Sequence, residues 1–305
     1  MNWKLRPAYL ATVVAVVLSI VACGSSPAPA PASKGTITIA GFAFSEGTVL
    51  MQLYGQALAH AGFTVNYKAN LGNREIVGPA LKTGQIDLYI GYAATDLEYY
   101  NNKAGEASGD VTAPTAKLNA RLQPLNLQAL TPSSAQDQNG FAMTQANATK
   151  YNATKLSDLA PIGNQLILGA GPECPTRPFC QLGLKNTYGI TFKSFKALDT
   201  DGPLTRAALK NNDIQLGLVF TSDADLQSLN LVVLQDDKHL QNADNVVPII
   251  RTAVASAAAT KVLNAVSAGL NTNDLIALNG QVQLQHQDAD VATKAYLSQH
   301  NWFGN

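Results

Sequence analysis

Two stretches decide the fold: PALKTGQIDLYIGY (Pro79–Tyr92) and AALKNNDIQLGLVF (Ala207–Phe220) share the pattern A-L-K-x-x-x-I-x-L in the same register. In each stretch a helix end leads through a turn into an apolar strand. Each strand then ends in an aromatic residue, Tyr92 in the first and Phe220 in the second. Ligands of open α/β sheets bind outside the carboxyl ends of the strands. We therefore expect two similar halves that place Tyr92 and Phe220 across one cleft.

Helix and strand signals alternate around these stretches. Strands are predicted at Thr36–Phe42 and Phe63–Ala69, with an apolar helical stripe between them that ends near Gly62. A short helix then precedes the strand that ends at Tyr92. This β-α-β-α-β order predicts an α/β fold with a mostly parallel sheet flanked by helices. The tail, Ser256–Leu297, is predicted to be helical with a break near residues 271–273.

The N-terminus has the pattern of an export signal. Lys4 and Arg6 precede the apolar run Leu10–Ala22, which is too short to span a bilayer comfortably and ends in IVAC. This pattern is typical of a bacterial lipoprotein signal over residues 1–22, with Cys23 as the lipidated residue. Residues 23–34 then form a Pro/Ala/Ser tether. We expect a protein anchored by lipid to the extracytoplasmic face of the cell membrane; the alternative is a plain anchor with a chance cysteine.

Composition argues against several function classes. The formal net charge is zero and the basic residues are scattered, which disfavours a nucleic-acid partner. The four histidines show no metal-ligand spacing, and neither a G-x-S-x-G elbow nor a P-loop pattern occurs. We therefore expect a binding protein that is not an enzyme and has no metal or cofactor.

Cys174 and Cys180 lie close together in the segment ECPTRPFC. Disulfides persist outside the cytoplasm, so we predict that these two cysteines pair. A zinc-binding pair is the alternative, but no histidine lies nearby.

The segment GQIDLYIGYAATDLEYY (Gly84–Tyr100) is rich in tyrosine. Strand alternation predicts that Tyr89 packs inside the fold. Tyr92 follows the apolar run and is flanked by Gly91 and Ala93, so we expect it to face a ligand. Tyr99 and Tyr100 are expected on the surface of the lobe, with the alternative that they reach the cleft.

Several segments resemble one family of binding proteins. They are ITIAGFAFSEGTVL, LGNREIVGPALKTGQIDLYIGYAATDL, LTPSSAQDQNGFAM, PECPTRPFCQLGLKNTYGI, ALKNNDIQLGLVFTSD and LVVLQDD. In this order they resemble the osmoprotectant (glycine betaine, choline and carnitine type) substrate-binding proteins of ABC importers. The resemblance implies two α/β lobes of the type II periplasmic-binding-protein-like fold, with the ligand in the cleft between them. Lobe I would comprise residues 35–139 and 244–305, and lobe II residues 140–243.

The resemblance also implies an aromatic cage for a quaternary ammonium group, because ring faces attract a cation that has no N–H to donate. By position the cage would include Tyr92 and Phe220, with Phe179 from the second lobe. Asp137 and Asn139 fall at the first crossover. The implied partners are an ABC permease and its ATPase.

Further candidates follow from the residues themselves. Arg74 could clamp a ligand carboxylate with two hydrogen bonds. Phe42, Phe44 and Glu46 flank the start of the first helix, where free N–H groups favour an anionic group; alternatively the two rings pack and Glu46 suits the helix dipole. Gln138 either touches ligand or holds the hinge.

The sequence departs from its relatives at several positions of this site. Gly47 and Gly91 stand where many relatives have Gln and Glu, and Arg74 stands where betaine binders commonly have Thr. The ligand therefore stays open between a quaternary-amine solute and an aromatic or carboxylated metabolite. A lipoprotein sensor that does not transport is a further alternative.

Overall fold

The structure, a computed structural model, describes Met1 and residues 33–109 and 112–301. The predicted signal segment, Cys23 and most of the tether lie outside the described residues. Ser33–Asn305 forms one compact unit. No helix in the described part of the chain is both long and apolar enough to cross a membrane.

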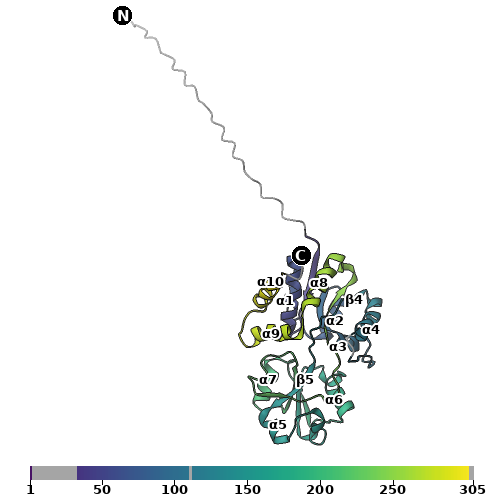
Figure 1. The fold of residues 1–305 in the computed structure, drawn as a ribbon, viewed down its shortest axis with the longest axis vertical. Coiled ribbons are helices and arrows are strands. Elements are labelled where there is room, and N and C mark those ends of the chain that lie inside the picture. The colour runs from purple at the N-terminus through teal and green to yellow at the C-terminus, as the bar shows by residue number, and fades with distance from the viewer. Residues whose placement is uncertain (2–32, 110–111, 302–305) are drawn as a thin grey trace. The chain divides into compact units, whose positions relative to one another are not determined.

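Within the described residues, the strands form two five-stranded sheets, and each sheet with its helices is called a lobe here (Figure 1). The first lobe has the strand order β2-β1-β3-β10-β4. Its strands are β1 (Thr36–Ala40), β2 (Thr64–Lys68), β3 (Leu88–Tyr92), β4 (Leu127–Ala129) and β10 (Val246–Arg251). Its helices are α1 (Ser45–His60), α2 (Arg74–Lys82), α3 (Ala93–Tyr100), α4 (Thr112–Leu122), α8 (Ala257–Gly269), α9 (Thr272–Gln283) and α10 (Ala289–Gln299), with the 3₁₀ turns η1 (Gln123–Leu125) and η5 (Thr252–Val254).

The second lobe has the strand order β7-β6-β8-β5-β9. Its strands are β5 (Asn139–Thr144), β6 (Ile167–Ala170), β7 (Ser194–Ala197), β8 (Leu216–Phe220) and β9 (Leu231–Val233). Its helices are α5 (Gln145–Tyr151), α6 (Gln181–Tyr188) and α7 (Pro203–Lys210), with the 3₁₀ turns η2 (Leu156–Leu159), η3 (Gly163–Gln165) and η4 (Cys174–Thr176).

The two sheets have the same plan. In the first, β1 pairs in parallel with β2 and β3, while β10 runs antiparallel to β3 and β4. In the second, β6 pairs in parallel with β7 and β8, while β5 runs antiparallel to β8 and β9. The two stretches that share a sequence pattern thus supply the central strands, β3 and β8. The α/β class and the two lobes predicted from the sequence are confirmed.

Burial explains why these central strands are apolar throughout. All five residues of β3 and all five of β8 are buried, as expected for strands covered by helices on both faces. Each lobe has its own large apolar core, and Phe44 packs against both of them. Lobe boundaries at residues 139 and 244 stay a prediction; the strands of the second sheet fall within residues 139–233.

The chain crosses between the lobes twice, after β4 and before β10. The two crossovers lie side by side, because the Asp137 backbone N–H donates to the Asp244 carbonyl at 3.1 Å and Gln136 bridges to Asn245. They enter β5 and β10 next to the ends of β8 and β3. The crossovers therefore bring polar side chains to the carboxyl ends of both central strands.

Candidate functional site

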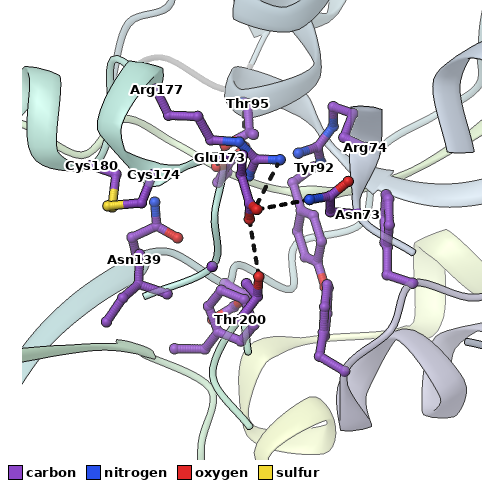
Figure 2. Close-up of a pocket in the computed structure, with 17 residues that line it drawn as sticks. Asn73, Arg74, Tyr92, Thr95, Asn139, Glu173, Cys174, Arg177, Cys180 and Thr200 are labelled. Atoms are coloured by element: carbon purple, nitrogen blue, oxygen red, sulfur yellow. Dashed lines mark hydrogen bonds and ion pairs between the residues drawn. A yellow bond between two sulfur atoms is a disulfide. The ribbon is translucent and has the colours of Figure 1, made fainter. Parts of the chain in front are cut away.

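A cavity lies at these strand ends and is lined by residues from both lobes (Figure 2). It encloses about 580 Å³ of space between atoms, including the part that opens to solvent. Tyr92 and Phe220 both line this cavity, so the structure brings the two strand ends to one site.

Four aromatic rings form a series across the cavity from one lobe to the other. The ring centroids of Tyr92 and Phe42 are 6.4 Å apart, those of Phe42 and Phe44 are 5.5 Å apart, and those of Phe44 and Phe220 are 4.9 Å apart. The first three rings belong to the first lobe and Phe220 to the second. Ring faces of this kind attract a cation most strongly where water is excluded.

The Phe42 ring depends on a glycine in α1. A Cβ atom at Gly47 would stand 2.8 Å from the Phe42 Cβ and carbonyl oxygen, which is closer than packed atoms allow. Gly47 therefore lets the start of α1 pack directly against Phe42.

Two buried aspartates line the same cavity as the rings, one on each crossover. Asp244 accepts hydrogen bonds from the Thr95 backbone N–H at 2.9 Å and from the Thr95 hydroxyl. Asp137 accepts from the Ser222 backbone N–H at 3.1 Å. Both side chains line the cavity. Each crossover therefore caps the turn that follows the central strand of its lobe.

Burial favours the protonated form of both aspartates. Burial raises the pKa of Asp244 to about 6, although its hydrogen bonds to Thr95 and the charge of Arg74 act in the opposite direction. Burial raises the pKa of Asp137 well above its usual range, and the neighbouring carboxylates of Glu46 and Asp223 raise it further. A cation bound beside these groups would favour their charged forms.

Arg74 lines the cavity but is already paired. Its Nε donates to Asp96 Oδ1 at 2.6 Å and its Nη2 donates to Asp96 Oδ2 at 3.3 Å, and both side chains are buried. Burial disfavours the charged guanidinium, but Asp96 and Tyr89 more than compensate and the pKa of Arg74 is raised. Its guanidinium carbon lies 5.2 Å from the centroid of Phe42. Arg74 therefore holds Asp96 through its Nε–Nη2 edge and supports Phe42, while its Nη1 side is not used by Asp96.

Glu46 lies behind the rings and not in the cavity lining. Its Oε1 accepts from the Tyr92 hydroxyl at 2.5 Å, and its Oε2 accepts from the Ser222 hydroxyl and from Asn279 Nδ2. Burial raises the pKa of Glu46. Because Ser222 belongs to the second lobe, this carboxyl group links the lobes through side chains.

Three other residues that were predicted to bind ligand lie in three different places. Asn139 lines the cavity, and its Nδ2 donates to the Phe179 carbonyl at 3.0 Å. The Phe179 side chain lines a neighbouring cavity instead. Gln138 lines neither cavity; its Nε2 donates to the Asn242 carbonyl at 2.7 Å, which ties the crossovers together as the hinge alternative proposed.

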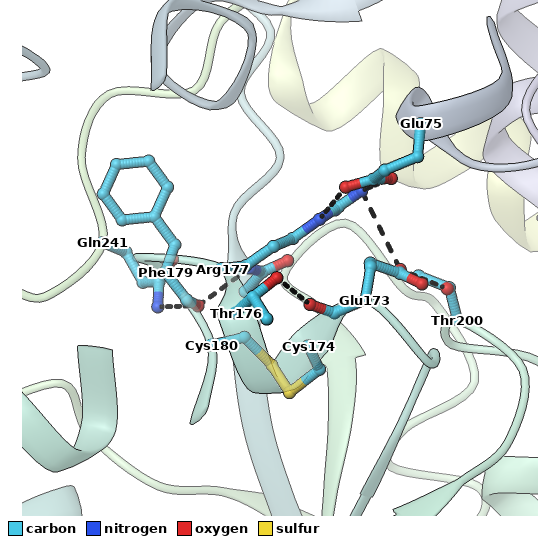
Figure 3. Close-up of a disulfide and its surroundings, with 10 residues drawn as sticks. Glu75, Glu173, Cys174, Thr176, Arg177, Phe179, Cys180, Thr200 and Gln241 are labelled. Atoms are coloured by element: carbon cyan, nitrogen blue, oxygen red, sulfur yellow. Dashed lines mark hydrogen bonds and ion pairs between the residues drawn. A yellow bond between two sulfur atoms is a disulfide. The ribbon is translucent and has the colours of Figure 1, made fainter. Parts of the chain in front are cut away.

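The disulfide segment supplies residues that were not predicted from the sequence. Cys174 and Cys180 are bonded, and Glu173 and Arg177 extend from their loop toward the first lobe (Figures 2 and 3). Asn73 donates to Glu173 at 2.7 Å, Thr200 donates to it at 3.0 Å, and Arg177 forms two hydrogen bonds with Glu75. The contacts of Glu173 with Asn73 and of Arg177 with Glu75 join the two lobes.

The polar lining residues that the sequence reasoning missed are Asn73, Thr95, Glu173, Arg177, Thr200 and Asp244. A sequence signal existed for only some of them. Asp244 stands two residues before β10 as Asp137 stands two residues before β5, so the repeat could have revealed it. Glu173 and Arg177 flank a predicted disulfide. Asn73, Thr95 and Thr200 had no comparable signal.

Comparisons with known proteins agree with this geometry. Residues 35–299 match the family described as the substrate-binding domain of ABC-type glycine betaine transport systems. The chain is 26% identical over 292 residues to the glycine-betaine-binding protein of Pseudomonas aeruginosa, covering 92% of this chain and 93% of that protein. It is 24% identical over 295 residues to the carnitine transport binding protein OpuCC of Listeria monocytogenes, covering 92% of this chain and 91% of that protein.

A solved structure shows the same fold. The crystal structure of a glycine betaine/carnitine/choline ABC transporter protein aligns with a TM-score of 0.66 at 20% identity, covering 88% of this chain and 100% of the other.

Proposed function

The chain belongs to the family of substrate-binding domains of ABC-type glycine betaine transport systems, and from that premise we propose that it captures a quaternary-amine compatible solute of the glycine betaine, choline and carnitine class. The series of four rings in a cavity that two buried aspartates also line carries the proposal. Proteins of this family bind substrates for import and are not enzymes. Ring faces and carboxylates together fit a cation that cannot donate a hydrogen bond.

The proposed mechanism is closure of the two lobes around the solute. Three rings and Asp244 lie on the first-lobe side, and Phe220 and Asp137 lie at the end of β8. A ligand that contacts both sets favours the closed form by its additional contacts. The contacts between Asn73 and Glu173 and between Glu75 and Arg177 would then add to closure.

We also propose that a lipid at Cys23 anchors the protein to the membrane, and that the anchored protein delivers its solute to an ABC permease and its ATPase. The sequence pattern at residues 1–23 supports this anchor. Replacing Cys23 by Ser should move the full chain from the membrane fraction to the soluble fraction and abolish labelling by a fatty-acid probe. Retention of both membrane association and label would contradict the anchor.

Calorimetry on the purified protein with choline, glycine betaine and L-carnitine tests the ligand class. We expect at least one of these compounds to bind. Phe220→Ala should weaken that binding by about 1–2 kcal/mol, as expected for a desolvated cation–π contact. Phe195→Ala, which changes a half-buried ring of β7 away from the cavity, is the control. Absence of binding by all three compounds would contradict the proposal.

A further inference from the structure

A second cavity adjoins the ring-lined one at the side of α3 and the disulfide segment. It encloses about 370 Å³ of space between atoms, including its opening to solvent. Arg74, Thr95, Asn139 and Arg177 line both cavities and so form the wall between them. We call the first cavity the head compartment and the second the tail compartment.

The head compartment keeps an excess of acidic groups after its ion pairs are counted. Its two arginines, Arg74 and Arg177, pair with Asp96 and Glu75, neither of which lines this compartment. Arg177 also forms an ion pair with Glu173 at 3.9 Å, so Asp137 and Asp244 remain as the lining carboxyl groups that neither arginine pairs with. The charge around the four rings therefore favours a cationic group.

The tail compartment has a different chemistry. Its apolar wall consists of Tyr99, Pro178 and Phe179. Figure 3 shows the Phe179 ring projecting away from the disulfide, while Arg177 reaches across to Glu75. A Cβ atom at Gly78 would stand 2.7 Å from the Tyr99 ring, so this glycine allows the ring to lie against α2.

The charges of the tail compartment are also distributed differently. Glu98 is buried and its two oxygens accept from the backbone N–H groups of Gly105 and Ala107 at 2.7 Å, so its charge is already stabilised. Lys103 is exposed and has no carboxylate within salt-bridge distance among the residues that the structure describes. Two successive residues with left-handed backbone, Asn102 and Lys103, hold this lysine at the compartment. The mouth of the tail compartment therefore favours an anionic group.

We propose that the tail compartment is a subsite for the far end of the ligand, so that the protein prefers a trimethylammonium compound whose carboxylate lies several bonds from the cationic head. This inference rests on the proposed function, because it assumes that the four rings bind the head. The head would lie among the rings, the chain would pass between Thr95 and Asn139, and the carboxylate would approach Lys103. A compound with a short spacer reaches only the head compartment.

A homologous series of ligands tests the subsite. Calorimetry on the purified protein would use glycine betaine, β-alanine betaine, γ-butyrobetaine and δ-valerobetaine, in which each step moves the carboxylate one methylene farther from the head. We expect affinity to rise by roughly tenfold from glycine betaine to γ-butyrobetaine, because each added methylene is buried on binding. Highest affinity for glycine betaine, with a steady decrease along the series, would overturn the proposal.

Variants separate the two compartments. Lys103→Met should weaken δ-valerobetaine about threefold and leave choline unchanged, since choline has no carboxylate. Tyr99→Leu should weaken the long betaines about fivefold with the same lack of effect on choline. Lys185→Met, which removes an exposed lysine of α6 that lines neither compartment, is the matched control. Equal losses for choline and the long betaines would overturn the subsite.

Failure of the subsite and failure of the proposed function give different results. Phe220→Ala should weaken every member of the series and choline alike. If it does so while spacer length has no effect, the head compartment stands and the tail subsite is wrong. If no trimethylammonium compound binds, both proposals fail.

Discussion

The ends of β3 and β8 have the same backbone arrangement but different side-chain contacts. After β3 the Tyr92 N–H donates to Asp96 at 2.8 Å, and after β8 the Phe220 N–H donates to Asp223 at 3.0 Å. Each of these aspartates pairs with an arginine from the preceding helix, Arg74 or Arg206, at distances of 2.6 and 3.1 Å. The backbone arrangement of one lobe thus recurs in the other.

The differences lie in the side chains. Tyr92 has a hydroxyl that donates to Glu46, and Phe220 has none. Arg74 has Asp96 as its ion-pair partner, whereas Arg206 pairs with Asp201, Asp223 and Asp225. The arginine at the end of the first strand therefore depends on one carboxylate, while the arginine at the end of the second has three carboxylate partners. Similar backbones can thus differ in how much each polar contact matters.

The largest effect is expected at the two aspartates that follow β3 and β8. Asp96→Asn should lower the free energy of unfolding by about 3–5 kcal/mol, because it leaves the buried Arg74 guanidinium without a carboxylate. Asp223→Asn, the matched change in the other lobe, should cost only about 1 kcal/mol because Arg206 keeps Asp201 and Asp225. Urea unfolding of both variants measures the difference. Equal losses would show that the two ends are energetically alike.

The next prediction concerns pH and the aspartate beside the first strand end. Asp244 has a pKa raised from 3.8 to about 6 in the folded protein. A raised carboxyl pKa means that its stabilising contribution is complete below about pH 4 and is lost as the pH rises through about 6. Relative to Asp244→Asn, the wild-type free energy of unfolding should fall by about 2–3 kcal/mol between about pH 4 and about pH 7. Parallel pH profiles for both proteins would contradict this.

Tyr92→Phe gives the first strand end the same aromatic residue that ends β8. It removes the hydroxyl that donates to the buried Glu46, and we expect a loss of about 1–2 kcal/mol in the free energy of unfolding. Tyr54→Phe is the control, since its buried hydroxyl bonds to Ser267 and lies away from both strand ends. A larger loss in the control would argue against the importance of Glu46.

The smallest expected effect concerns the interlobe ion pair between Glu75 and Arg177. Its side chains are 42% and 19% exposed, so solvent screens the attraction. Glu75→Gln should weaken ligand affinity by about twofold, less at high salt, and leave the free energy of unfolding nearly unchanged. Calorimetry at low and high ionic strength measures this. A tenfold loss that persists in salt would mean that the pair governs closure.

The sequence predicted the elements that depend on local periodicity. Apolar runs gave β3 and β8, and their shared pattern indicated the repeated lobes before any contact was known. The pairing of Cys174 with Cys180 was also predicted, because the cysteines are only 6 residues apart. Of the expected site residues, Phe42, Phe44, Arg74, Tyr92, Asp137, Asn139 and Phe220 line the head compartment.

The partners of the polar side chains could not be predicted in the same way. Glu46 meets Ser222 across 176 residues, and Arg177 meets Glu75 across 102. The sequence allowed Arg74 to be a carboxylate clamp, since nothing local indicated that Asp96 would occupy one edge of its fork. Gly91 leaves the room that Asp96 needs, because a Cβ atom there would stand 2.1 Å from Asp96 Oδ2.

The amino-acid sequence by itself determined two α/β units with an aromatic residue at the end of each central strand, because hydrophobic periodicity acts within a few residues. Only the tertiary structure decided which charges remain for a ligand. That choice depends on which side chains meet across the lobes, and a buried charge must find its partner in space wherever that partner lies in the chain.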